Sequence, residues 1–217
     1  MSGALQAVFQ NQRSFGDPPP TVIGQAYGGG YYAGQIGVSS VATHYLVVGP
    51  VASAQTSNIK YKNANTATTG ADSDIDGPQN TADIVADGNS TTYPAGHFCN
   101  DLVIGGFTDW YMPAKNELEV CYYNLKPTTT SNNTSSGINP NAVPARASNY
   151  TAGNPAQTSA TDFKDTGAED FTNAGYWAST ESSATAAWST YFGYGLQMSG
   201  NGKTTSYRVR AVRRVAV

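Results

Sequence analysis

The chain has 217 residues, of which 12% are charged, and its formal net charge is −3. This length is enough for one well-buried core, and the weak negative charge excludes a general nucleic-acid binder, which would usually be basic. Glycine (23) and tyrosine (14) are frequent, a composition that suits adaptable binding loops and equally suits a loop-rich β protein, because tyrosine is a good strand former.

Residues 1–20 are predicted to form an attachment arm and residues 21–217 a domain. Three consecutive prolines at 18–20 hold an extended segment and end any preceding helix. The arm is too short to bury a core, so we expect it to dock on another protein or else to pack back on the domain. The sequence predicts neither a signal peptide nor membrane insertion, because no apolar run approaches the ~20 residues that span a bilayer.

The first part of the domain is rich in glycine and then becomes apolar. The glycines at 24–37 favour tight turns over a phosphate loop, because no Gly-Lys-Ser/Thr follows them. The next run, VATHYLVV at 41–48, predicts a strand that Gly49 and Pro50 end.

Three aspartates in residues 72–77 match the opening half of a calcium loop. The twelfth position of that loop would be Asp83, where the pattern requires Glu. We therefore expect no metal here, but a turn leading into a helix over 80–86. Residues 93–99 are expected to be a connector or the end of that helical region. His97 and Cys99 in that segment are too few ligands for a zinc site.

The segment 105–127 gives the clearest local signal. Pro113 suits the start of a helix because its missing N–H is not needed there, and Pro127 ends the helix. Glu117 and Glu119 suit the positive end of the helix dipole. One apolar face recurs at i, i+3, i+4 and i+7, formed by Leu118, Cys121, Tyr122 and Leu125.

The two cysteines, Cys99 and Cys121, could form one disulfide, but two buried free thiols are favoured, because free cysteine behaves as a small hydrophobe. The stretch 127–160 is dominated by Thr, Ser, Asn, Pro and Ala. Loops this long are usually functional or disordered.

The last forty residues contain two aromatic runs separated by Ser-Gly-Asn-Gly at 199–202. Residues that tolerate positive φ predict a hairpin turn at this point. A basic strand at 207–215 then closes the chain. We expect the rest of the domain to pack around this hairpin.

Three segments, DWYMPAKNELEVCYYNLKP, YWASTE and YRVRAVRRV, together carry a family resemblance. They resemble the C-type-lectin-like (Lcl-type) domain of phage tail proteins and collagen-like bacterial adhesins, which is related to the variable proteins of diversity-generating retroelements. The resemblance implies an α+β, C-type-lectin-like fold with two helices and twisted antiparallel sheets, and with both chain ends close together.

The same resemblance implies structural roles for Trp110, Pro113, Glu181 and Arg210. A carboxylate and a guanidinium in these signatures suggest a hypothesis, namely that Glu181 and Arg210 form a partly buried pair that sets strand register.

The resemblance implies a non-enzymatic virion adhesin, a tail-fibre or tail-tip protein, that binds a host cell-surface glycan or protein. The predicted contact residues are Trp188, Tyr191, Tyr194, Gln197, Met198, Asn201, Lys203 and Ser206. Enzymes of similar fold that make formylglycine need a cysteine pair near the C-terminal end, whereas both cysteines here precede residue 122. We therefore expect no catalytic residue and no cofactor.

The expected partners are the host receptor and other virion tail or capsid proteins, the latter contacted through residues 1–20. Weak sites on many copies gain avidity, so we expect a homo-oligomer, a trimer being one candidate, on the phage particle after assembly in the host cytoplasm. The competing hypothesis is a capsid or tail decoration protein with no receptor role.

Overall fold

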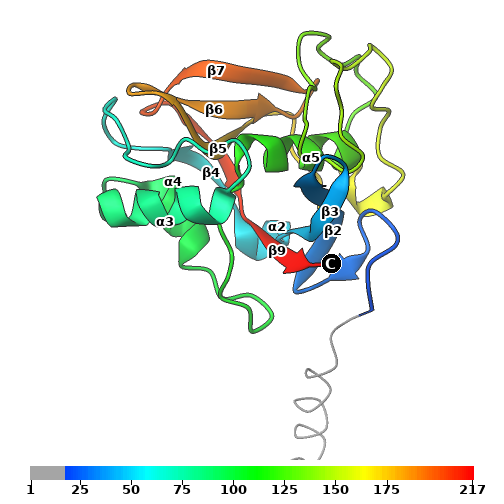
Figure 1. Cartoon of the computed structure of the whole chain (residues 1–217), viewed down its shortest axis with the longest axis horizontal. Helices are drawn as coiled ribbons and strands as arrows, with labels where there is room; N and C mark the ends of the chain where they lie inside the picture. The colour runs from blue at the N-terminus through cyan, green and yellow to red at the C-terminus, as the bar shows by residue number, and fades with distance from the viewer. Residues whose placement is uncertain (1–17) are drawn as a thin grey trace, which may run out of the picture.

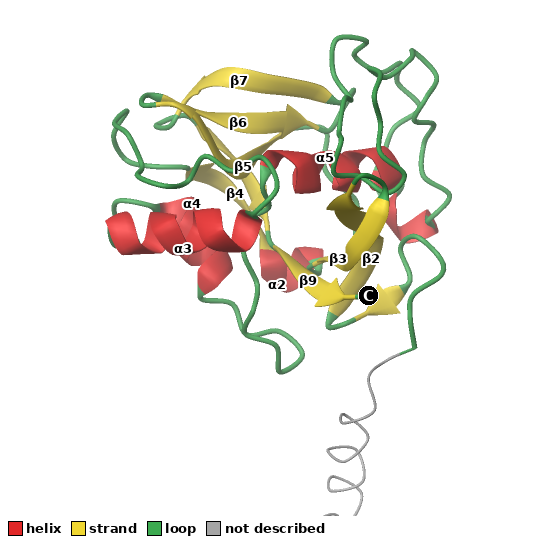
Figure 2. Cartoon of the chain, in the orientation of Figure 1, coloured by secondary structure: helices red, strands yellow, loops and turns green. Residues whose placement is uncertain are grey.

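The computed structural model describes residues 18–217, so the predicted arm lies outside the described residues except for its three prolines. The described chain forms two sheets (Figure 1, Figure 2). The first has the strand order β1-β2-β3-β9, and the second has the order β4-β8-β5-β6-β7. The strands are β1 (Ala26–Tyr27), β2 (Gly30–Val38), β3 (Val41–Val48), β4 (Gln55–Lys60), β5 (Gly175–Ser183), β6 (Ala186–Tyr191), β7 (Leu196–Gly202), β8 (Ser206–Arg210) and β9 (Val212–Ala216).

The described residues contain four α-helices: α2 (Val51–Ala54), α3 (Gly77–Asp87), α4 (Pro94–Asn100) and α5 (Lys115–Leu125), with a 3-10 turn at Thr161–Phe163. The architecture is α+β and agrees with the C-type-lectin-like fold, although two helices were expected. Within this part of the chain, none of the helices has the length and apolarity to cross a membrane.

The predicted helix at 80–86 is confirmed as α3, which begins earlier because Asp76 accepts a hydrogen bond from Gln79 N and Pro78 occupies the first turn. Residues 93–99 were expected to be a connector or the end of that helical region, but the chain there forms a separate helix, α4. Its first residue is Pro94, a residue type that suits a helix start.

Most local predictions elsewhere are confirmed. Strand β3 spans the predicted 41–48, and β9 pairs with it and joins the sheet that begins with β1. The first and last strands of the described chain therefore lie at the two edges of one sheet (Figure 1). Arg213 Nη1 of β9 donates to Gly28 O beside β1 at 3.0 Å, so these two parts lie close together, as the resemblance implied.

Helix α5 lies between the two sheets and packs against β2, β5 and β6 (Figure 2). Its four predicted apolar residues are all buried. They join a cluster with Phe171, Tyr176 and Phe192, in which the rings of Phe171 and Phe192 stack with centroids 4.0 Å apart. Fully burying a large apolar side chain contributes about 1.5–3 kcal/mol, so this helix is a main source of stability.

A second cluster lies around Trp110 and Trp177, beside α3 and α4. Trp110 is 2% exposed and Pro113 is buried, and the carbonyl oxygen of Pro113 accepts a hydrogen bond of 2.8 Å from Ser179 N. Cys99 belongs to this cluster and Cys121 to the cluster around α5, and both are buried free thiols, as predicted.

The hairpin predicted at 199–202 is wrong. These residues lie inside or at the end of strand β7, which pairs with β6, and the tight turn precedes β7. Gly195 in that turn has φ +74°, and a Cβ added there would lie 2.3 Å from the ring of Tyr122. The backbone therefore turns where it must avoid α5. Strand β8 lies between β4 and β5.

Candidate ligand-binding cleft

Two buried basic residues take partners that the sequence did not indicate. Arg210 Nη2 lies 2.7 Å from Glu169 Oε2, and its Nε donates to Gly49 O at 2.8 Å. Glu181 instead pairs with Lys203, whose Nζ lies 3.0 Å from Oε2. The predicted Glu181–Arg210 pair is therefore wrong, because Glu169, in a loop distant in sequence, supplies the carboxylate for Arg210.

Lys203 was predicted to contact ligand, and this prediction is wrong as well. Its side chain is 0% exposed. In addition to Glu181, its Nζ donates to Thr66 O at 2.8 Å and to Thr68 Oγ1 at 3.1 Å. These partners use all three ammonium protons, so Lys203 ties β7 to the 66–68 segment.

The other predicted contact residues divide between two faces of the β6–β7 pair. Gln197 lies opposite Thr190, on the face that carries Trp188, whereas Met198 lies opposite Ser189. Asn201 is on the Ser189 face, because its Nδ2 donates to Ser189 Oγ at 2.8 Å. Side chains alternate along a strand, so one ligand site on a sheet face cannot contain both groups.

Tyr191 and Tyr194 pack against each other at the β6–β7 turn, with ring centroids 5.0 Å apart, and both are half-buried. Ser206 is exposed at the start of β8, opposite Lys60 of β4. These three residues lie away from the face of Trp188 and Gln197.

Trp188 and Gln197 line a cleft of about 470 Å³, which we call the outer cleft. Its walls come from the N-terminal end of α5, from β6 and β7, and from the long loop after α5. The full lining is Asp74, Lys115, Asn116, Ser135, Ser136, Gly137, Ile138, Pro140, Asn141, Asn149, Trp188 and Gln197.

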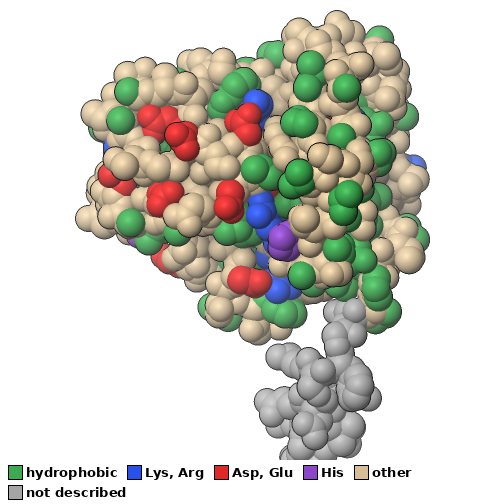
Figure 3. All heavy atoms as spheres, viewed as in Figure 1, with side chains coloured by type: hydrophobic (Ala, Val, Ile, Leu, Met, Phe, Trp, Pro, Cys, Tyr) green, Lys and Arg blue, Asp and Glu red, His purple; other side chains and the backbone are tan. Residues whose placement is uncertain are grey.

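The charges in the outer cleft are balanced. Lys115 Nζ lies 2.8 Å from Asp74 Oδ2 and 4.3 Å from the centroid of the Trp188 ring. A cation over an indole face is attracted by the ring quadrupole, so Lys115 holds the indole against the end of α5. The remaining lining residues are uncharged, and Figure 3 shows that the side of the molecule built by the long loop carries few charged side chains.

Two polar atoms on residues of the outer cleft are buried and unpaired among the described residues, namely Asn116 Oδ1 and Gln197 Nε2. The other half of each amide is in use: Asn116 Nδ2 donates to Asn141 Oδ1 at 2.8 Å, and Gln197 Oε1 accepts from Gly137 N at 3.1 Å. Most buried polar groups in native proteins are hydrogen-bonded. Two residues that line the cleft therefore each have one buried hydrogen-bonding atom without a partner in the described part of the chain, an acceptor on Asn116 and a donor on Gln197.

The long loop at 127–160 is hydrogen-bonded to Glu119 of α5, which is 0% exposed. Tyr150 Oη donates to Glu119 Oε1 at 2.7 Å, Asn139 Nδ2 donates to Oε2 at 2.5 Å, and Arg146 pairs with the same carboxylate. Every partner is a donor, and a carboxylate offers only acceptors. One helix residue thus orders the wall of the outer cleft.

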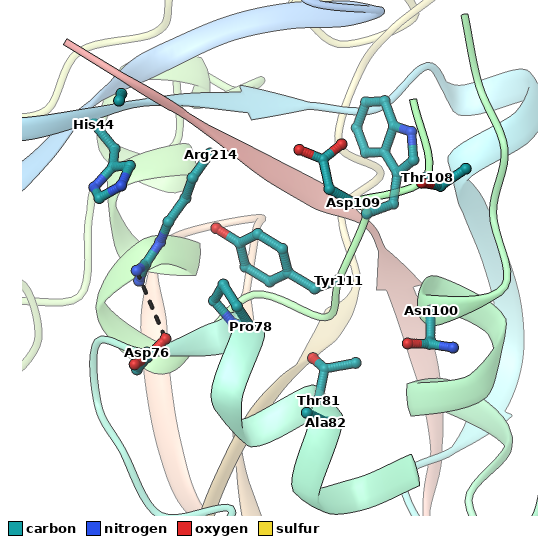
Figure 4. Close-up of a pocket in the computed structure, with 12 residues that line it drawn as sticks. His44, Asp76, Pro78, Thr81, Ala82, Asn100, Thr108, Asp109, Tyr111 and Arg214 are labelled. Carbon is teal, nitrogen blue, oxygen red and sulfur yellow. Dashed lines mark ion pairs between the residues drawn. The ribbon is translucent and has the colours of Figure 1, made fainter. Parts of the chain in front are cut away.

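A second cleft, of about 500 Å³, lies between α3, α4 and the β3–β9 pair, and we call it the basal cleft. Figure 4 shows Arg214 between His44 and Asp76, with Thr81 and Asn100 toward the opposite end. Arg214 Nε lies 2.7 Å from Glu117 Oε1, and its Nη1 lies 3.7 Å from Asp76 Oδ1. Burial and the Arg214 charge lower the pKa of His44. The ion pairs of Arg214 attach β9 to α5 and to the start of α3, so we assign this cleft a structural role.

Two of the three aspartates of 72–77 have structural partners in this fold, since Asp74 pairs with Lys115 and Asp76 caps α3. His97 Nε2 hydrogen-bonds Gly88 O at 2.7 Å. Among the described residues, no group of three or more His, Cys, Asp or Glu side chains is placed to hold a metal ion.

The sequence predicted two residues of the outer cleft, Trp188 and Gln197, but not the lining residues from α5 and from the long loop. The signal for the walls was the uncommon length of the 127–160 loop, which indicated function without indicating which residues face a ligand. The contribution of Lys115 and Asn116 could not be predicted, because it depends on the N-terminal end of α5 lying beside β6.

A family model described as the Lcl C-terminal domain matches residues 62–213. Among solved structures, a fimbrial protein from Bacteroides ovatus ATCC 8483 is similar, with 17% identity and a TM-score of 0.44. The match covers 77% of this chain and 35% of that protein, so the chain spans about a third of its length. No curated protein matches the chain.

Proposed function

The chain belongs to the Lcl C-terminal domain family, and from this premise we propose that it is a non-enzymatic, adhesin-type protein that binds a cell-surface glycan or protein through the outer cleft. The observation that carries the proposal is the cleft itself, in which an indole, an exposed aliphatic side chain and many amides converge on a concave surface. Concave sites with aromatic side chains and a few directed polar groups are typical of ligand-binding sites.

The absence of catalysis is part of the proposal. The nucleophilic form of cysteine is the thiolate, and burial raises the pKa of both Cys99 and Cys121 well above the ordinary value. The two thiols also lie in different core clusters. They are therefore poorly suited to the paired-thiol chemistry of formylglycine-forming enzymes.

We further propose that the protein is displayed on a phage particle as a tail-fibre or tail-tip component. This rests on the resemblance of the signatures at 109–127, 176–181 and 207–215 to phage tail proteins, and on the arm at 1–20, which would attach to other virion proteins. A homo-oligomer would present several outer clefts at once, and linked weak sites gain avidity without new contacts.

The test is binding of the purified full chain to a panel of bacterial cells, read by flow cytometry of labelled protein. Trp188→Ala removes the indole and its contact with Lys115, and we expect at least about tenfold weaker binding, as is usual for a central aromatic anchor. Met198→Ala is the matched control, because Met198 is a half-buried residue on the opposite face of the same strand pair.

Unchanged binding by Trp188→Ala together with loss in Met198→Ala would move the site to the other face of the sheet. An outer cleft that is covered by a neighbouring subunit in intact particles would favour the decoration role instead.

A further inference from the structure

The balance of charge in the outer cleft narrows its ligand class. Asp74 and Lys115 neutralise each other at 2.8 Å, and the remaining lining residues are amides, hydroxyls, one indole, one aliphatic side chain, a proline and a glycine. A charged ligand would lose hydration here without meeting an unpaired countercharge, which is unfavourable. The cleft is therefore suited to an uncharged ligand.

The two unpaired atoms specify the polar part of that ligand. Asn116 Oδ1 requires a donor and Gln197 Nε2 requires an acceptor. Both atoms are buried, and both belong to residues that line the outer cleft. A ligand reaches them after each amide rotates about its terminal torsion, which is broad. A ligand group that carries an N–H and a C=O together would satisfy both residues.

An apolar contact completes the pattern. Ile138 is 52% exposed and lines this polar cleft, as does the half-buried ring of Trp188. An exposed isoleucine alone needs no explanation, but this one lines the same cleft as the two unpaired amides. A methyl group attached to the ligand's carbonyl would cover part of this surface.

Resting on the proposed adhesin function, we propose that the outer cleft recognises the acetamido group of an uncharged, N-acetylated glycan. The acetamido N–H would donate to Asn116 Oδ1, its carbonyl would accept from Gln197 Nε2, and its methyl would pack on Ile138 and Trp188. The exposed side chains of Ser135 and Asn149 lie where they can meet ring hydroxyls.

A sugar fits these observations better than a peptide. Peptides commonly bind by adding a strand to an open sheet edge, and β7 is such an edge. The cleft residues Trp188 and Gln197 instead lie on the face of the sheet, and a flat indole with surrounding amides and hydroxyls suits a polyhydroxylated ring.

The experiment compares two matched pairs of sugars displayed on a polymer: N-acetylglucosamine against glucose, and N-acetylgalactosamine against galactose. Binding of the full chain is measured by biolayer interferometry. Within at least one pair we expect the acetamido sugar to bind about tenfold more tightly, which corresponds to 1.4 kcal/mol. Equal binding within both pairs, or binding to none of the four sugars, overturns the inference.

Gln197→Glu removes the proposed donor but keeps the oxygen that accepts from Gly137 N. We expect this variant to lose the preference for the acetamido sugar. Gln35→Glu is the matched control, because Gln35 is a half-buried glutamine on β2, outside the cleft lining, and it should keep the preference. A preference that survives Gln197→Glu contradicts the assigned contact.

Failure here can be told apart from failure of the proposed function. If no sugar binds but Trp188→Ala still weakens binding to cells, the acetamido inference fails and the adhesin function stands. If cell binding is independent of Trp188, the proposed use of the outer cleft fails.

Discussion

Two carboxylates on one helix, Glu117 and Glu119, separate the molecule into two regions with different tasks. Both are fully buried, and residues two positions apart on an α-helix point about 200° apart. Glu117 binds Ala114 N and two residues that line the basal cleft, Arg214 of β9 and Tyr111 through its Oη. Glu119 faces the long loop and binds Arg146, Asn139 and Tyr150.

A buried carboxylate with hydrogen-bond donors around it therefore holds the last strand on one side of α5 and orders a loop of the proposed binding surface on the other. At the basal side the partner is a strand that completes a sheet, so the contact contributes to the whole fold. At the outer side the partners lie in a loop, so the contact orders one wall of the outer cleft. The difference teaches that a buried carboxylate can stabilise either the fold or a site, depending on what it holds.

The largest expected effect is that of Glu117→Gln. Every partner of Glu117 is a donor, so an amide cannot replace the carboxylate. Arg214 would keep the backbone oxygen of Ile75 as an acceptor, but its only remaining countercharge among the described residues would be the more distant Asp76. Leaving a buried charge without its partner is strongly destabilising, and we expect a loss of about 3 kcal/mol in the free energy of unfolding. Urea denaturation followed by tryptophan fluorescence measures it.

Asp101→Asn is the control for this substitution, because the Asp101 side chain is 65% exposed and lies 4.0 Å from His97. It should change stability by less than about 0.5 kcal/mol. A loss below about 1 kcal/mol in Glu117→Gln would mean that β9 is fastened mainly by its strand pairing.

A smaller global effect is expected for Glu119→Gln, about 2 kcal/mol, because a loop is easier to release than a closing strand. Its distinctive consequence is local: the 127–160 loop should become sensitive to proteolysis, and cell binding should fall with it. Limited trypsin digestion followed by mass spectrometry locates the cuts, with Arg146 as the expected site. An intact loop in this variant would show that Glu119 is dispensable for the cleft wall.

The smallest expected effect concerns the reactivity of the two thiols. Cys99 lies in the cluster beside α3 and α4, and Cys121 lies in the cluster around α5, so each thiol reports on a different region. Burial raises the pKa of both thiols, so at pH 8 the native protein should react negligibly with a maleimide. Full labelling should appear only in denaturant. Rapid labelling of Cys99 in Glu117→Gln, with slow labelling of Cys99 in Glu119→Gln, would support separate roles for the two carboxylates. Equal labelling rates in the two variants would contradict separate roles.

The spacing of apolar residues along the chain was sufficient to predict the helices and strands that bury one apolar face in the core. The apolar spacing from Leu118 to Leu125 predicted α5, and the run at 41–48 predicted β3. In both cases the spacing of apolar residues along the chain determines which face of the element is buried. The aromatic strand with Trp188 was also found, and with it part of the outer cleft.

Partner choice and turn position were decided by the packed molecule. Arg210 and Lys203 each found a carboxylate other than the expected one, since a buried charge takes the partner that the fold brings within 3 Å, however distant it is in sequence. The turn lies before β7 and includes Gly195, where the Tyr122 ring leaves room for a glycine alone, whereas residues 201 and 202 pair with β6. Hydrophobic pattern is a property of neighbouring residues, whereas ion pairing and steric contact depend on distances that exist after the chain has folded.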